Sequence, residues 1–370
     1  LPKEIKTLEN RVALVPSSVQ ELTRCGHEVF VETNAGLGIG ESDDKYIAVG
    51  AKILPTAADV FAAASLIVKV KEPQPVECKM LNKDHTLFTY LHLAPDPQQA
   101  ELLLASNCCA IAYETVTDAY QGLPLLSPMS EVAGRMAIQA GAHCLEKPQG
   151  GSGVLLGGVP GVPSAKVVVL GGGVVGINAI RMAIGQEAHV TVIDKSLRRL
   201  KELDLQFASR LNTLYATAHV IDKAVVQADL VIGAVLVPGA SAPRLVSREQ
   251  LKRMRKGSVL VDVAIDQGGC FETSRVTTHD KPTFEEEGVI HYCVANMPGA
   301  VPRTAAFALN NATLPFVMAL ANKGVKQALL EDPHLLNGLN VYHGHLTYKA
   351  VAEALNKEYV PALEALCGDQ

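Results

Sequence analysis

The chain has 370 residues, which is long for a single hydrophobic core, so we expect two domains. Its formal net charge of −5 and its scattered Lys and Arg residues argue against a nucleic-acid interface or a basic membrane-binding patch. No apolar stretch reaches membrane-spanning length without a charge, Gly or Pro. Eight cysteines show no CxxC pair and no zinc-like spacing, so we expect free thiols in a reducing compartment, the cytoplasm, and no metal site. The expected partner is a small molecule, with no nucleic acid and no membrane.

Helix-like and strand-like segments alternate over the first 116 residues. The first is a helix starting at Ser17 or Ser18, either of which could cap it, and stopping at Gly26. Apolar, β-branched segments then alternate with alanine- or leucine-rich ones, which predicts a mainly parallel sheet with helical crossovers. The expected strands are 27–33, 51–54, 65–70, 86–91 and 108–116.

A second alternation begins after a long helix expected from about Ser130 to Glu146 and a glycine-rich connection over 149–166. No Gly-Lys-Ser/Thr follows those glycines, so a hairpin-like linker is favoured over a phosphate loop. From about Thr304 the chain is expected to be helical, with Pro315 kinking or interrupting the helix. We predict an α/β protein with two doubly wound Rossmann-like domains, one inserted in the other and joined to it by the long helices near residues 130 and 310. The boundaries are 1–126 with 304–370, and 127–303.

The inserted domain opens with a dinucleotide fingerprint. Gly171, Gly173 and Gly176 have G-x-G-x-x-G spacing directly after a β-branched strand and before a helix-like run. A second strand ends in Asp194, about 20 residues further on, where a carboxylate can accept hydrogen bonds from the ribose hydroxyls. Because a carboxylate repels a 2′-phosphate, NAD is favoured over NADP. The arginines at 198–199 leave that preference open to question, although an exposed basic helix face is the preferred interpretation.

Ionisable residues gather at the carboxyl ends of the predicted strands. Lys71, His92 and Glu114 each end a strand of the first domain, and Arg11 lies near its first loop. Singly, each has an ordinary explanation as a surface cation, a core histidine or a cap. Ligands of open parallel sheets bind beyond the carboxyl ends of the strands, so together they suggest a site for an anionic substrate. Asp266 ends a long apolar strand in the other domain, where either a turn role or a place near the nicotinamide is possible.

An ordered series of motifs along the whole chain resembles the alanine dehydrogenases. This family belongs to a larger group that includes the NAD-binding part of proton-translocating nicotinamide nucleotide transhydrogenase. The motifs that carry the resemblance are PKEIKTLENRVALVP, VKVKEP, LFTYLHLA, AIAYETV, LLSPMSEVAG, VLGGGVVG, IGAVLVPGA, VDVAIDQGGC and NMPGAVPRTAAFALNNATLP.

The resemblance implies a role for each site residue. Arg11 would bind the substrate carboxylate, with Lys71 assisting and polarising the keto oxygen. His92 would be the general acid and base, and Asp266 would stand near the nicotinamide and help with proton handling. The residues implied to line the NAD site, besides the fingerprint glycines, are Ser130, Val174, Asp194, Val235, Leu236, Asn296 and Met297.

The implied reaction is NAD-dependent oxidation of L-alanine to pyruvate and ammonium, in a homo-oligomer that is a hexamer by resemblance. One alternative is the transhydrogenase-like NAD-binding subunit, which in that family lacks the counterparts of His92 and Asp266. Others are a catalytically silent NAD-sensing subunit and a dehydrogenase of another amino acid.

Overall fold

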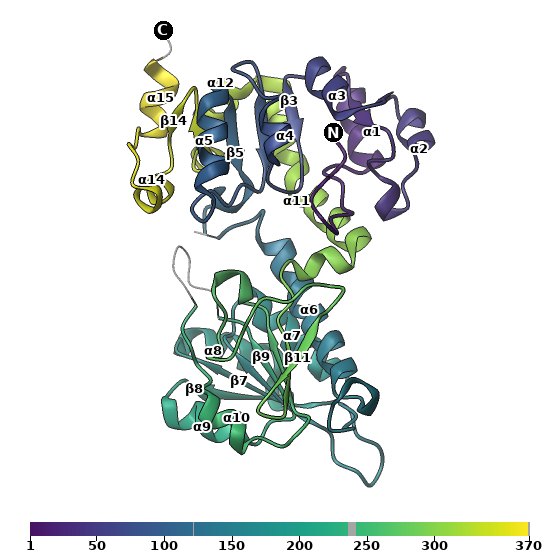
Figure 1. The fold of residues 1–370 in the computed structure, drawn as a ribbon, viewed down its shortest axis with the longest axis vertical. Helices are drawn as coiled ribbons and strands as arrows, with labels where there is room; N and C mark the ends of the chain where they lie inside the picture. The colour runs from purple at the N-terminus through teal and green to yellow at the C-terminus, as the bar shows by residue number, and fades with distance from the viewer. Residues whose placement is uncertain (121, 236–241, 369–370) are drawn as a thin grey trace. The chain divides into compact units, whose positions relative to one another are not determined.

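The computed structural model describes residues 1–120, 122–235 and 242–368. The chain forms two compact units (Figure 1). Unit 1 comprises Leu1–Met129 and Val301–Gln370, and unit 2 comprises Ser130–Ala300. Helix α6 (Ser127–Cys144) carries the chain from unit 1 into unit 2, and α11 (Pro302–Lys323) begins just after the chain returns. The assignment of the units as substrate and NAD domains stays a prediction.

Unit 1 is built on a five-stranded sheet in the order β14-β13-β5-β4-β3. Strands β3, β4 and β5 run parallel, as the alternating pattern predicts, and their carboxyl ends therefore meet at one edge. The C-terminal segment, which we expected to be helical, also adds two strands, and β13 pairs antiparallel with both β5 and β14. The strands are β3 (Leu66–Val68), β4 (Thr86–Thr89), β5 (Cys109–Ala112), β13 (Leu339–Tyr342) and β14 (His345–Leu346).

The remaining elements of unit 1 include a separate parallel pair of strands, β1 (Phe30–Glu32) and β2 (Lys52–Leu54). We expected both segments in the main sheet, so that part of the prediction is wrong. The first helix starts with Pro16 in its first turn after Val15, so neither expected serine caps it. The helices are α1 (Pro16–Arg24), α2 (Asp43–Ala48), α3 (Ala57–Ala63), α4 (Pro75–Cys78), α5 (Pro97–Ser106), α12 (Val325–Glu331), α13 (Pro333–Leu336), α14 (Lys349–Leu355) and α15 (Ala362–Gly368).

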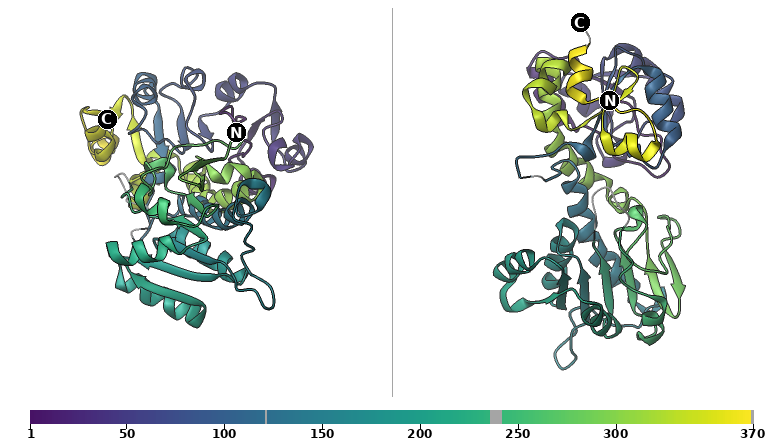
Figure 2. Two further views of the ribbon diagram at one scale, coloured as in Figure 1. Left: turned by 60° about the horizontal axis from the view of Figure 1, so that its bottom comes forward. Right: turned by 90° about the vertical axis from the view of Figure 1, so that its left-hand side faces the viewer.

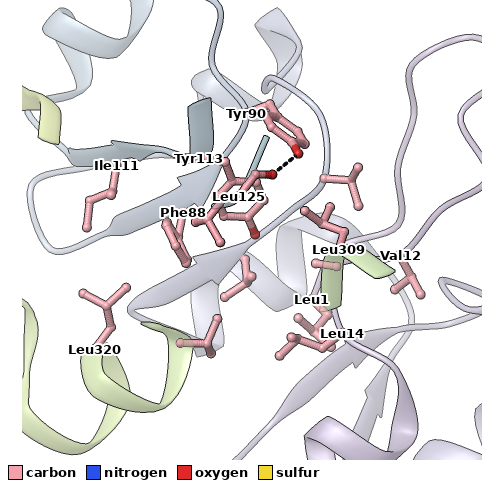
Figure 3. Packing of buried hydrophobic residues seen from close by; sticks show 14 of the residues in the cluster. Leu1, Val12, Leu14, Phe88, Tyr90, Ile111, Tyr113, Leu125, Leu309 and Leu320 are labelled. Atoms are coloured by element: carbon pink, nitrogen blue, oxygen red, sulfur yellow. Dashed lines mark hydrogen bonds between the residues drawn. The ribbon is translucent and has the colours of Figure 1, made fainter. Parts of the chain in front are cut away.

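Helix α11 supplies one wall of the unit 1 core. Leu309 and Leu320 belong to the same buried cluster as Phe88 and Tyr113 from the sheet side (Figure 3). By length and composition α11 is the one helix in the described part of the chain that could cross a membrane. Ala305, Ala306, Leu309, Val317 and Leu320 on this helix are buried in the unit 1 core. It continues through Pro315 without interruption.

Unit 2 is built on a seven-stranded sheet in the order β11-β12-β10-β9-β6-β7-β8. Figure 2 shows this sheet, coloured teal to green, with helices beside it. All neighbouring pairs are parallel except β11 with β12. The order reverses between β6 and β9, which is the switch point where doubly wound folds bind nucleotides. The strands are β6 (Lys166–Leu170), β7 (His189–Asp194), β8 (Leu211–Tyr215), β9 (Leu230–Gly233), β10 (Val259–Asp262), β11 (Thr283–Glu286) and β12 (Val289–Tyr292).

The helices of unit 2 cross between its parallel strands. Helix α7 packs on β6 and β7, and α8 packs on β7 and β8. The glycine-rich connection before β6 does form a hairpin-like turn, with an antiparallel bridge between Val159 and Val162. The helices that follow it are α7 (Val174–Gly185), α8 (Leu197–Phe207), α9 (Ala218–Val226) and α10 (Arg248–Arg253).

Candidate active site

Arg11 lies in the buried segment before α1 and is held by Glu9. Its side chain is only 1% exposed. Arg11 Nε donates to Glu9 Oε1 at 2.7 Å and Nη2 donates to Oε2 at 2.6 Å, while Nη1 lies 3.0 Å from Met129 Sδ. Burial alone would raise the pKa of Glu9, but the hydrogen bonds and charge of Arg11 lower it to about 2. Both partners are therefore ionised, and the guanidinium has one fixed orientation.

Lys71 follows β3 and lies within electrostatic reach of Arg11. Burial, and then the positive charge of Arg11, lower the pKa of Lys71. Its carbonyl accepts a hydrogen bond from the Thr89 hydroxyl at the end of β4, at 2.9 Å. Within the described ranges, no hydrogen bond or ion pair holds its ammonium group. Two cations thus share one region, which suits an anionic ligand.

His92 follows β4 and has an unusual backbone conformation. Its φ is +48°, in the left-handed region that few non-glycine residues adopt. Its ring stacks parallel on Tyr90, with centroids 5.7 Å apart, and its side chain remains 46% exposed. Tyr90 is buried and donates its hydroxyl to the Leu125 carbonyl at 2.5 Å (Figure 3). The histidine is therefore presented at the surface of unit 1 on a fixed aromatic support.

Glu114 joins His92 to the next strand. It lies in the short 3-10 turn Tyr113–Thr115 that follows β5, beside the carboxyl end of β4. The pKa of the Tyr90 hydroxyl is raised, mainly by burial. The charge of Arg11 opposes this rise, and the charge of Glu114 adds to it. Arg11 and Glu114 thus both act on Tyr90, the ring on which His92 stacks, so these residues share one neighbourhood of unit 1.

A buried triad of ionised side chains lies beside this neighbourhood and was not predicted from the sequence. Lys69 is fully buried, with its Nζ 3.1 Å from Glu4 Oε2 and 2.7 Å from Glu77 Oε1. Glu4 also accepts a hydrogen bond from the Val70 backbone at 2.7 Å. The alternation of two lysines in VKVK is a signal that both share one face of the strand, but nothing in the spacing indicates which acids they meet.

The fingerprint glycines of unit 2 have the geometry that their spacing predicts. Gly171 has φ +96°, which lets the chain turn sharply from β6 into α7. A Cβ on Gly176 would lie 1.9 Å from the Gly171 carbonyl oxygen, so helix and turn pack too closely for any side chain. Among residues 1–120, 122–235 and 242–368, a Cβ on Gly173, the residue before the helix, would meet nothing within 4 Å. This cradle fits a pyrophosphate group.

Asp194 ends β7 and faces the same turn. Its Oδ2 accepts the Gly172 N–H at 2.7 Å and its Oδ1 accepts the Ser196 N–H at 2.8 Å. Arg199 bends back to donate from Nε to the Gly172 carbonyl at 2.5 Å, so our expectation of a purely exposed arginine holds for Arg198 but not for Arg199. The carboxylate is therefore fixed beside the fingerprint turn, and its contact with a ribose stays a prediction.

The other predicted cofactor residues lie in four places in or beside unit 2. Val235 follows β9, and its Cγ2 would be 3.0 Å from a Cβ on Gly171, so these two positions adjoin. Asn296 has φ +57°, and Met297 begins a buried 3-10 turn after β12. Leu236 lies outside the described residues. The remaining two are Ser130, in α6, and Val174, the first residue of α7 and 40% exposed.

Asp266 is exposed in the short 3-10 turn Ile265–Gln267 after β10. A second aspartate, which the sequence reasoning did not single out, pins this loop. Asp262 is fully buried and accepts the backbone N–H groups of Ala264 at 3.2 Å and Cys270 at 2.8 Å. Both ends of the loop that carries Asp266 are thus tied to one carboxylate, and burial raises the pKa of Asp262 despite these bonds.

Comparison with known proteins agrees with this geometry. The family descriptions "Alanine dehydrogenase/PNT, N-terminal domain" and "Alanine dehydrogenase/PNT, C-terminal domain" match residues 1–133 and 137–349. The chain is 59% identical to the alanine dehydrogenase of Halomonas elongata, over 98% of both chains. It is 55% identical to that of Methanococcus maripaludis, over 99% of this chain and 98% of the relative.

Solved structures show the same likeness. An L-alanine dehydrogenase structure superposes with a TM-score of 0.93 at 53% identity, covering 96% of this chain and 98% of that one. A transhydrogenase from Sinorhizobium meliloti superposes with a TM-score of 0.79 at 26% identity, covering 94% and 98% of the two chains. The chain belongs to the alanine dehydrogenase/PNT family.

Proposed function

We propose that this chain is an L-alanine dehydrogenase, which converts L-alanine, NAD⁺ and water to pyruvate, ammonium, NADH and a proton, and catalyses the reverse reaction. The observation that carries the proposal is that Lys71 lies near Arg11, and Arg11 near the Tyr90 ring on which His92 stacks, in a chain whose unit 2 has a dinucleotide cradle. The transhydrogenase-like alternative is less favoured, because the sequence likeness to the alanine dehydrogenases is about twice as high.

The two cations have different tasks in this proposal. A guanidinium binds a carboxylate through paired hydrogen bonds, so Arg11, already oriented by Glu9, is assigned to the substrate carboxylate. Lys71 is a compact charge suited to the keto oxygen of pyruvate and to the negative charge that develops on the carbinolamine oxygen.

His92 is assigned the proton transfers. NAD, when bound, accepts the hydride from the α-carbon of alanine. His92 takes a proton from the ammonium group before that step and releases it to solvent. It then takes a proton from the water that attacks the resulting iminium and passes it to the amino group of the carbinolamine, and it takes the hydroxyl proton of the carbinolamine as ammonia departs. Asp266 is assigned a place near the nicotinamide, where it assists the proton handling. The exposed ring of His92 is accessible for these transfers.

Asp194 is assigned to the ribose hydroxyls, which makes NAD the preferred cofactor over NADP. Gly171, Gly173 and Gly176 would cradle the pyrophosphate, and the other predicted residues would line the same site. We also propose that the substrate domain comprises 1–126 with 304–370 and the NAD domain 127–303. We also propose that the protein assembles as a homo-hexamer and is located in the cytoplasm.

The test is NADH consumption by the purified protein with ammonium and a panel of 2-oxo acids. Pyruvate should give the highest kcat/KM, and turnover only with dicarboxylic or long-chain acids would refute the substrate assignment. His92→Ala should abolish turnover while NADH binding, followed by its fluorescence, is retained. Near-normal turnover of that variant would contradict the acid–base role.

A further inference from the structure

Glu114 contacts His92 directly, and the proposed function gives Glu114 no role. Its Oε1 accepts the backbone N–H of His92 at 2.6 Å, and both of its carboxylate oxygens lie 3.2 Å from the backbone nitrogen of Leu91. The same Oε1 lies 3.8 Å from His92 Nδ1. One carboxylate therefore touches both the backbone and the ring of the residue assigned to proton transfer.

We propose that Glu114 is a positioning residue for His92. The inference rests on the proposed function, because it concerns the geometry of that reaction's acid and base. Glu114 reaches His92 because β4 and β5 are adjacent and parallel, with Thr89 level with Ala112, so the residues that follow the two strands emerge at the same edge.

The backbone contact stabilises a conformation that His92 would otherwise leave. A residue with a side chain is strained at φ +48°, at a cost that surrounding interactions must offset. Hydrogen bonds from backbone N–H groups to a carboxylate are charge-assisted and stronger than those to a neutral acceptor. Glu114 is only 15% exposed, so water competes weakly for its oxygens. The carboxylate thus keeps the chain turned so that the ring lies over Tyr90.

The ring contact selects which nitrogen serves the substrate. A negative charge beside Nδ1 favours the tautomer with the proton on Nδ1, which leaves Nε2 with the lone pair that accepts a proton. The stacked Tyr90 ring prevents the imidazole from tilting away. Backbone and ring contacts together present Nε2 in one orientation, and small displacements of a catalytic group reduce turnover by up to about 100-fold.

The test compares Glu114→Gln and Glu114→Ala with the unaltered enzyme. Gln keeps one acceptor oxygen for the backbone and loses the charge, whereas Ala loses both. We expect kcat for pyruvate reduction to fall about 10-fold in the first and about 100-fold in the second. The KM for pyruvate and the Kd for NADH should stay within about twofold, since neither Arg11 nor the dinucleotide cradle is touched. A general loss of structure would move all three quantities.

Asp96→Asn is the matched control. Asp96 lies on the same loop as His92, and its carboxylate caps α5 by accepting the Gln99 N–H at 3.0 Å, a role that Asn also fills. The kcat of Asp96→Asn should stay within about twofold of the kcat of the unaltered enzyme. Thermal unfolding verifies that each variant is folded, and if Glu114→Ala does not fold, Glu114→Gln decides alone.

The inference is overturned if Glu114→Gln retains its kcat, if its defect lies in KM or in NADH affinity, or if Asp96→Asn loses kcat equally. The unaltered enzyme is assayed first with the panel of 2-oxo acids. Inactivity at that stage refutes the proposed function and the inference with it, whereas an active parent with unaffected Glu114 variants refutes the inference alone.

Discussion

The buried pair of Glu9 and Arg11 allows a quantitative prediction about stability. The pKa of Glu9 falls from its ordinary value of 4.5 to about 2 in the folded protein. That shift corresponds to about 3 kcal/mol of stabilisation at neutral pH. Glu9→Gln removes this stabilisation and leaves the buried guanidinium without its anionic partner, a change that costs about 3–5 kcal/mol in other buried pairs. We therefore expect unit 1 to lose about 3 kcal/mol of unfolding free energy at pH 7.

The pH dependence follows from the direction of the shift. A lowered folded-state pKa contributes stability that is complete above about pH 4.5 and is lost as the pH falls toward 2. The difference between Glu9→Gln and the parent should shrink over the same range. Replacing both partners, as Glu9→Gln with Arg11→Met, should cost less than Glu9→Gln alone, because no unpaired charge remains buried.

The assay is hydrogen exchange of peptides from residues 1–129, measured by mass spectrometry in increasing urea. Peptide resolution separates the opening of unit 1 from that of unit 2, which a single global transition would merge. Glu21→Gln is the control, since Glu21 pairs with Arg24 at the surface, where both side chains are more than half exposed and such a pair contributes little. A loss below about 1 kcal/mol for Glu9→Gln at pH 7, or one that does not change down to pH 3, would refute the reasoning.

Three further predictions concern the cradle, the ribose contact and the ion triad. Gly176→Ala should lower the melting temperature, because its Cβ would lie 1.9 Å from a carbonyl oxygen. Gly173→Ala should have the melting temperature of the parent and bind NADH more weakly. Equal melting temperatures for the two variants would contradict the packing argument. Asp194→Ala should raise the KM for NAD at least about 10-fold and leave the KM for alanine unchanged in steady-state assays, and equal weakening would count against the ribose contact. Lys69→Met should cost about 3 kcal/mol or more in urea unfolding, since it leaves two buried glutamates without a cation, and a loss below 1 kcal/mol would show that the triad is not needed.

Features that depend on a few neighbouring residues were predictable from the sequence. The turn at Gly171, the close packing at Gly176 and the carboxylate at the end of β7 follow from backbone sterics and strand length, so their spacing predicts their geometry. The position of His92 beyond a strand end was predictable for the same reason, because parallel strands align their carboxyl ends.

Expectations failed where the partner lies far away along the chain. The C-terminal strands β13 and β14 join the first sheet, and the pairing of β13 with β5 is invisible in its short local pattern. Likewise Val15 rather than a serine precedes α1, and its N–H is bonded by Asn310, which lies 295 residues away.

The two alternating α/β halves, the dinucleotide fingerprint and the residue types available for chemistry follow from local sequence, since periodicity and turn chemistry are local properties. How those residues are held depends on the folded chain. It pairs Arg11 with Glu9, buries Lys69 between two glutamates and sets Glu114 against the strained backbone of His92. These contacts depend on desolvation and on distances between segments that meet only after folding, so no spacing in the chain indicates them.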